Sequence, residues 1–317
     1  MKRAISLFVS LGILLIIYLQ IDYDQVVGVL QAVRSDWLLV SFVMVIPITG
    51  VTAWRLRGLV PLTAQMYFCQ ALQLILTASS LNMVLPSKLG DLAKSVFMRD
   101  KGGIKGTLAF SIVVFEKTLD LLALMAWCAI GLLFYAREEL FFLLLTMSVI
   151  AGLLGGLTLL ASRRCACYCF SLKRYAPPRM QGRIESLQES WGEMQAYFWG
   201  DRWRIVYLFA TSMFLWFLHL LQIWLFVISL GTHVSFITSM GLASLAIFAG
   251  LLPLTFAGIG TRDAALIMLY SPYMDVSTGA ALGVLCTMRY VLPALAGIPF
   301  LAGGLAMLKR RGTENPL

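Results

Sequence analysis

Long apolar segments alternate with short polar segments along most of the chain. Six of the apolar segments are long enough to cross a membrane as a helix, which takes roughly 20 apolar residues. The predicted full spans are Ala4–Gln20, Trp37–Trp54, Thr107–Tyr135, Leu140–Ala161, Ile205–Leu230 and Thr278–Leu308. No small-residue cleavage site follows the first segment, so we expect it to be retained as a span. The pattern predicts an all-α polytopic membrane protein.

Two further apolar segments are predicted to be re-entrant hairpins. Leu62–Leu85 has Arg57 before it and the basic run "PSKLGDLAKSVFMRDKGGIK" after it, and basic loops favour the cytoplasm. A single crossing would place one of these flanks outside, so we expect a hairpin that enters and returns. Phe236–Tyr270 lies between an outward and an inward span and is interrupted by Pro253 and two glycines. We expect it to enter from the opposite side, and the two opposed hairpins suggest an inverted repeat.

The polar segments complete the predicted topology. The segment "IDYDQVVGVLQAVRSD" has apolar residues at helical spacing and is expected to lie in the interface. Residues 162–204 form a predicted cytoplasmic loop, in which Gly182–Trp199 is an amphipathic helix. The whole chain, 1–317, is thus predicted to be one integral membrane domain with both termini in the cytoplasm.

Composition and charge agree with this class. The chain is 60% hydrophobic and 13% charged, and its mean hydropathy is +0.84, whereas soluble domains are about 45–50% apolar. Of the 25 lysines and arginines, only Arg34 and Arg137 fall in segments predicted to lie outside. This asymmetry predicts that the protein lies in a cell (inner) membrane with its basic segments on the cytoplasmic side. We therefore interpret the net charge of +9 as a topology signal and expect no nucleic-acid partner.

The cysteines give little indication of a metal. Cys165, Cys167 and Cys169 alternate in "CACYC" beside two arginines. A metal site is conceivable there, but zinc sites generally pair such cysteines with histidine or a second cysteine pair. Reduced thiols at a cytoplasmic membrane edge are the simpler interpretation. No metal or other cofactor is expected.

Charged residues inside the predicted spans and hairpins are candidate ligands, because ionisable groups in hydrocarbon are costly and usually functional. The candidate substrate-binding residues are Lys88, Asp91, Glu116, Asp120, Thr261, Arg262, Asp263 and Arg289. Glu116 and Asp120 are four residues apart and share a helix face, so they need a cation from another element. Either these groups line a cavity for a charged substrate, or they form internal ion pairs that lock the helices together.

The stretch "FAGIGTRDAAL" predicts a half-helix inside the second hairpin. Gly258 and Gly260 allow a sharp turn, Thr261 suits the N-cap, and Asp263 suits the first helical turn. A helix N-terminus beside an arginine is an anion site. We expect Arg262 to meet a carboxylate or a lipid phosphate across the cavity, because adjacent helical side chains do not face each other. His219 is interpreted as a structural residue, with a proton relay as the alternative.

Four motifs in this order resemble the flippase-like membrane domain of lysylphosphatidylglycerol synthases. They are "LPSKLGDLAKSVFMRDK", "FEKTLDLLAL", "AGIGTRDAAL" and "RYVLPALAG", and the resemblance extends over about Met1 to Leu308. Lys117 and Asp263 stand where the family pattern has Arg and Glu. The resemblance implies transport of a charged or sugar-bearing lipid between leaflets. In the synthases a soluble aminoacyltransferase domain follows; this sequence ends at Leu317, so we expect transport and not synthesis.

Three functions stay open at this stage. The first is a lipid transporter or flippase, with a membrane lipid as substrate. The second is a membrane enzyme acting on a lipid-linked substrate, which would need acid–base groups and usually a metal. The third is an accessory partner of a lipid-modifying enzyme. We favour the first and expect no enzymatic activity; no Walker-type loop is present to support ATP-driven transport.

Overall fold

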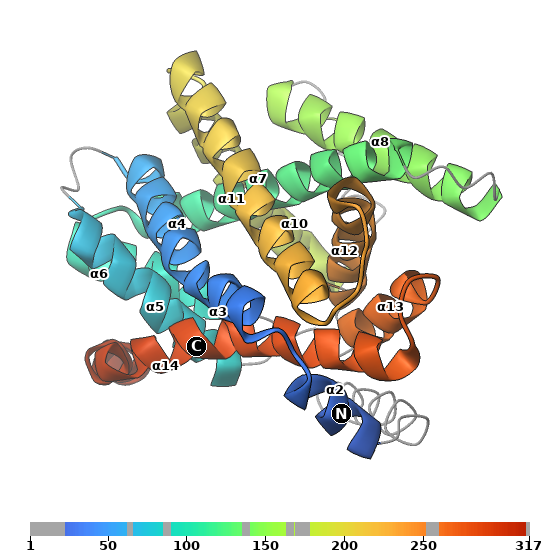
Figure 1. Cartoon of the computed structure of the whole chain (residues 1–317). Coiled ribbons are helices and arrows are strands. Elements are labelled where there is room, and N and C mark those ends of the chain that lie inside the picture. Colours follow the sequence, from blue (N-terminus) through green and yellow to red (C-terminus); the bar gives the residue numbers. More distant parts are fainter. Residues whose placement is uncertain are drawn as a thin grey trace.

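The computed structural model describes residues 23–61, 66–84, 90–134, 140–162, 168, 178–251 and 260–314, and the regular secondary structure within these ranges is helical (Figure 1). In chain order the helices are α2 (Tyr23–Gln31), α3 (Ser35–Val43), α4 (Val45–Leu59), α5 (Phe68–Val84), α6 (Gly90–Gly102), α7 (Gly106–Leu133), α8 (Leu140–Ala161), α10 (Pro178–Phe198), α11 (Arg202–Ser229), α12 (Phe236–Leu251), α13 (Thr261–Tyr270) and α14 (Val276–Glu314). The all-α fold is confirmed. The predicted first span, 4–20, lies outside the described residues.

Three helical segments are long and apolar enough to cross a membrane: Ser35–Leu59, Trp203–Ser229 and Val276–Leu301. Helix α7 has 28 residues, a length of about 42 Å, but it carries Glu116, Lys117 and Asp120 near its middle. Helix α8 begins and ends where its span was predicted. A multi-pass membrane protein follows from these segments together.

The helices fall into two similar units, α4–α7 and α11–α14, and the units pack reciprocally. In each unit the second and third helices form a hairpin, the first packs on the second, and the third packs on the fourth. Between units, α5 of the first packs along α14 of the second, whereas α12 of the second packs along α7 of the first. Helices α4 and α11 also meet. Such reciprocity is the contact pattern of units related by a two-fold axis, as an inverted repeat requires.

Two close helix crossings hold the units together. Gly131 of α7 lies against Gly241 of α12, and a Cβ added to Gly131 would lie 2.3 Å from the backbone nitrogen of Gly241. Gly297 of α14 lies against α5, where a Cβ would approach the Leu76 carbonyl oxygen to 2.1 Å. Small residues allow this backbone approach between membrane helices. The crossings involve corresponding helix pairs, α7 with α12 and α14 with α5.

The first hairpin differs from its prediction. Helix α5 runs without reversal from Phe68 to Val84, so this described part of the predicted hairpin does not fold back on itself. No glycine or proline interrupts α5, and therefore nothing in it favours a turn. The returning limb is α6, which the sequence suggested was a cytoplasmic basic run. The second hairpin has its break where expected, between α12 and α13.

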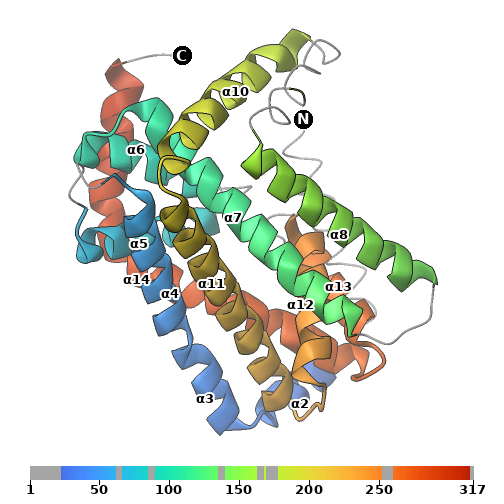
Figure 2. The same ribbon diagram turned by 90° about the horizontal axis from the view of Figure 1, so that it is seen from above.

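Figure 2 shows that polar elements gather at the two ends of the helix bundle. Helix α10, the start of α11 and the C-terminal end of α14 lie at one end, whereas α2 and the α11–α12 connection lie at the other. Helix α14 changes direction along its course and contains Pro293 and Pro299, the residue type that commonly kinks a helix. The amphipathic helix predicted at Gly182–Trp199 is α10, Pro178–Phe198.

Candidate functional site

A cavity of about 260 Å³ lies between the two units. Each of the eight helices α4–α7 and α11–α14 contributes to its wall. Five cations line it: Arg55, Lys94, Lys117, Arg262 and Arg289. Three carboxylates line it as well: Asp91, Glu116 and Asp120. Five of the eight predicted candidates thus line this cavity, namely Asp91, Glu116, Asp120, Arg262 and Arg289, although many of their charges are already paired.

A network of six charges, Arg55, Asp91, Lys94, Glu116, Lys117 and Asp120, occupies one side of the cavity. Arg55 of α4 binds two carboxylates of α7: its Nη2 lies 3.1 Å from Glu116 Oε1, and its Nη1 donates to Asp120. Arg55 also donates to the Ser212 hydroxyl of α11. Arg55 and Glu116 are each 1% exposed. The spacing of four residues between Glu116 and Asp120 thus allows both carboxylates to contact the same arginine.

The remaining links of the six-charge network join hairpin helix α6 to α7. Lys94 Nζ lies 3.0 Å from Glu116 Oε1 and 3.1 Å from Asp91 Oδ1. Lys117 Nζ lies 2.9 Å from Asp91 Oδ2 and 3.7 Å from Asp120 Oδ2. Each of the three carboxylates therefore has two cationic partners, and the six-charge network is electrically neutral.

The prediction that Glu116 and Asp120 need a cation from another element is confirmed. Arg289 does not pair with them, and Lys88 lies outside the described residues. Arg55 and Lys94 supply the charge; the sequence interpretation had placed both in cytoplasmic flanks. The only sequence signal for these cations was that two carboxylates on one face of a span need nearby positive charge. That signal does not show which of the basic residues flanking the spans is buried beside them.

The start of α13 corrects the predicted cap. Gly260, and not Thr261, is the N-cap residue; its φ is 99°, a conformation that only glycine adopts readily. Thr261 is the first residue of the helix. Asp263 accepts a hydrogen bond from the Gly260 N–H at 3.2 Å, and its place in the first turn is as predicted. Gly258 lies outside the described residues.

Arg262 is bound by its own hairpin and by α14. Its Nη2 lies 2.6 Å from Asp263 Oδ1, so the expectation that these neighbours do not face each other is wrong. Asp263 lies in the first turn of α13, and its side chain also accepts a hydrogen bond from the N–H of the N-cap residue Gly260. Arg262 further donates to Thr287 Oγ1 at 2.7 Å and to the Gly283 carbonyl. Gly250 of α12 leaves room for its stem.

Arg289 differs from the other cavity cations. It is 3% exposed and donates to the His219 carbonyl at 3.3 Å and to the Tyr290 hydroxyl at 2.6 Å. Its guanidinium lies 4.7 Å from the centre of the Tyr290 ring. Its Nε is buried without a hydrogen-bond partner. Among the described residues, no carboxylate lies within ion-pair distance of it.

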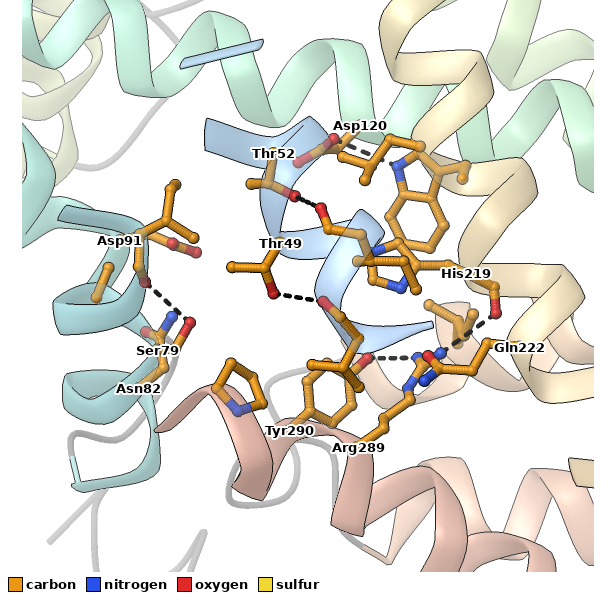
Figure 3. Close-up of a pocket in the computed structure, with 18 of the residues that line it drawn as sticks. Thr49, Thr52, Ser79, Asn82, Asp91, Asp120, His219, Gln222, Arg289 and Tyr290 are labelled. Atoms are coloured by element: carbon orange, nitrogen blue, oxygen red, sulfur yellow. Dashed lines mark hydrogen bonds between the residues drawn. The ribbon is translucent and has the colours of Figure 1, made fainter. Parts of the chain in front are cut away.

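Uncharged polar groups line the space between Arg289 and the six-charge network, as Figure 3 shows. The hydroxyls of Thr49, Thr52 and Ser79 each donate to a carbonyl one turn earlier in their own helix. Gln222 donates through its amide nitrogen to the Ser41 carbonyl. Each of these groups retains oxygen lone pairs that can accept a hydrogen bond. The wall is thus rich in acceptors.

Within the described parts of the chain, no group of three or more His, Cys, Asp or Glu side chains is placed to hold a metal ion. The three cysteines of "CACYC" lie outside those parts. His219 is a cavity-wall residue whose ring lies 5.3 Å from that of Trp216. Trp216 also donates to Asp120 at 3.3 Å.

Comparison with known proteins relates the chain to a family and to a membrane protein of another organism. The family model described as the lysylphosphatidylglycerol synthase transmembrane region matches residues 3–297. A UPF0104 membrane protein of Methanocaldococcus jannaschii is 23% identical over 312 aligned positions, which cover 93% of each chain. The residues matched by the family model include those that line the cavity.

Proposed function

Because the chain belongs to the lysylphosphatidylglycerol synthase transmembrane-region family, we propose that it moves a charged or sugar-bearing phospholipid between the two leaflets of a cell (inner) membrane. The observation that carries the proposal is the cavity of about 260 Å³ between the two units, with Arg289 buried in its wall. Ligand sites of many transporters lie at the interface of such repeats, beside interrupted helices. Ionisable groups inside a membrane protein are rare, and they often mark the path of a substrate or an ion.

The size of the cavity supports a lipid headgroup as the ligand. Pockets for small molecules usually measure about 300–1,000 Å³, so a cavity of about 260 Å³ suits a headgroup and not a whole lipid. The acyl chains would remain in the bilayer while the headgroup crosses. The half-helices α6 and α13, whose first turns carry Asp91 and Arg262, lie beside the cavity and are the elements we expect to move.

A reconstitution experiment tests the function. The purified full chain is incorporated into phosphatidylcholine vesicles that contain a trace of fluorescent phosphatidylglycerol, and dithionite then bleaches the label in the outer leaflet. Protein-free vesicles keep about half of the label protected. With the protein, we expect nearly all of the label in protein-containing vesicles to become accessible. Glu116→Gln should abolish this, because it removes the carboxylate shared by Arg55 and Lys94.

The matched control is Arg57→Gln, at an exposed arginine two residues from Arg55. It should transport like the wild type, and size-exclusion chromatography should show that all variants are folded. The proposal would be contradicted if the same fraction of label stays protected from dithionite with and without the wild-type protein, both for phosphatidylglycerol and for sugar-bearing lipids. Lipid binding without transport would instead favour the accessory-partner alternative.

A further inference from the structure

We propose, on the premise of the proposed function, that the cavity selects lipids of net charge −1, with a phosphodiester held by Arg289 and an uncharged hydroxylated headgroup beside it. The six-charge network is neutral because its three carboxylates and three cations pair with one another. Arg262 pairs with Asp263. Of the charges that line the cavity, the one on Arg289 has no counter-charge among the described residues.

The predicted anion site at the start of α13 is already occupied by the protein. The Gly260 N–H at this helix end donates to Asp263 Oδ2. The Arg262 guanidinium donates to Asp263, Thr287 and main-chain carbonyls of α14. A phosphate here would have to displace Asp263 and would meet its negative charge. Arg262 is therefore a positioning residue, which holds α13 against α14 in this conformation and thereby positions the wall that carries Arg289.

Arg289 has the properties of an incomplete anion site. A guanidinium has five N–H donors, and Arg289 uses two of them in the bonds to His219 and Tyr290. Both acceptors are neutral. The Nε donor is buried and has no partner. A buried charge of this kind is strongly unfavourable by itself, and the planar donor set matches two oxygens of a phosphate.

The same wall disfavours an ammonium group on the headgroup. A bound ammonium needs a carboxylate, yet Asp91, Glu116 and Asp120 each already contact two cations. Placing another cation there would add a positive charge to a neutral network. Hydroxyl groups fit better, because Thr49, Thr52, Ser79 and Gln222 offer acceptor lone pairs to the cavity. Headgroups such as glycerol or a neutral sugar match this wall.

Binding measurements on the detergent-solubilised full chain test the selectivity. Dissociation constants are measured by native mass spectrometry for dioleoyl-phosphatidylglycerol, dioleoyl-phosphatidylcholine and lysyl-phosphatidylglycerol, of net charge −1, 0 and +1. We expect phosphatidylglycerol to bind at least about tenfold more tightly than the other two lipids, because a hydrogen bond to a charged group contributes about that much to affinity. Arg289→Gln should remove this preference, and Arg289→Lys should keep part of it. Arg57→Gln should leave it unchanged.

The possible outcomes separate this inference from the function on which it rests. Equal or tighter binding of the zwitterionic or cationic lipid by the wild type would overturn the selectivity, even if the vesicle assay shows transport. Unchanged binding of phosphatidylglycerol by Arg289→Gln would overturn the site. Inorganic phosphate competing at micromolar concentration would show that the site takes a soluble phosphate and not a lipid. Selective binding through Arg289 without transport would support the site and contradict the transporter.

Discussion

At the scale of single residues, the main feature is that most buried charges of the cavity wall are compensated by ion pairs, with Arg289 as the exception among the described residues. Lys94 and Glu116 are 3% and 1% exposed and lie 3.0 Å apart. On α6, the helix that carries Lys94, Arg99 and Asp100 form an ion pair in which their side chains are 34% and 26% exposed. Ion pairs near water contribute about 0–1 kcal/mol, whereas removing one partner of a buried pair costs about 3–5 kcal/mol. Helix α6 therefore offers an internal comparison.

We expect Lys94→Met to lower the free energy of unfolding by about 3 kcal/mol, because it leaves buried carboxylates under-compensated. Arg99→Met, the control, should lower it by less than about 1 kcal/mol. Adding Glu116→Gln to Lys94→Met should cost less than the sum of the two single changes, with a coupling of about 1–3 kcal/mol. Unfolding in mixed detergent micelles measures all three. Equal effects of Lys94→Met and Arg99→Met would rule out a buried network.

At the scale of helices, the two units are joined where glycine permits backbone contact. Gly131 meets Gly241 between α7 and α12, and Gly297 meets Leu76 and Ser80 between α14 and α5. Reciprocal packing implies that both crossings are equally intolerant of a side chain. By contrast, Gly155 on α8 is exposed and has nothing within 4 Å of an added Cβ.

Gly131→Val and Gly297→Val should therefore each lower the thermal midpoint or prevent recovery of monodisperse protein. The clashes would be with backbone atoms, which cannot move aside as a flexible side chain can, and overpacking typically costs about 1–3 kcal/mol or more. Gly155→Val should behave like the wild type. Fluorescence-detected size-exclusion chromatography after a temperature series provides the measurement. A tolerant Gly297 beside an intolerant Gly131 would argue against equivalent crossings.

At the scale of the whole molecule, the arrangement of polar elements indicates an orientation. Helix α10 and the C-terminal end of α14 lie at one end of the bundle, and the turn after α13 lies toward the other (Figure 2). The basic residues of the polar loop 162–204 favour the cytoplasm for the α10 end. The opposite end, which includes α2, would then face outside. Both termini are expected in the cytoplasm, and the orientation stays a prediction.

Single cysteines at Gly192 and Ser271, each in a background without the six native cysteines, test this orientation. Gly192 is exposed on α10, and Ser271 is exposed just after α13. A membrane-impermeant maleimide added to intact cells should label Ser271→Cys and leave Gly192→Cys unlabelled, whereas both should react after lysis. Labelling of Gly192→Cys from outside would reverse the proposed topology. Labelling of both positions would mean that the two ends are not separated by a membrane.

Much of the architecture could be derived from the sequence, because apolar length and helical period are local properties. The bounds of α8 were predicted without error, and those of α7 and α11 to within three residues. The break between α12 and α13 was marked by glycine and proline. The carboxylates Glu116 and Asp120 were recognised because charge inside a predicted span is visible without knowledge of its neighbours.

Which charges meet was decided by the tertiary structure alone. Arg55 and Lys94 have the sequence context of ordinary flanking bases, yet the packing of α4 and α6 against α7 buries both beside Glu116. Asp263 satisfies Arg262, whereas Arg289, an equally basic residue, has no described carboxylate partner. Whether a charge is neutralised depends on contacts of a few ångströms between distant segments, and Coulomb interactions at that range are set by the packing. The sequence determined that charge lies in the membrane, and the fold determined which charge remains available to a ligand.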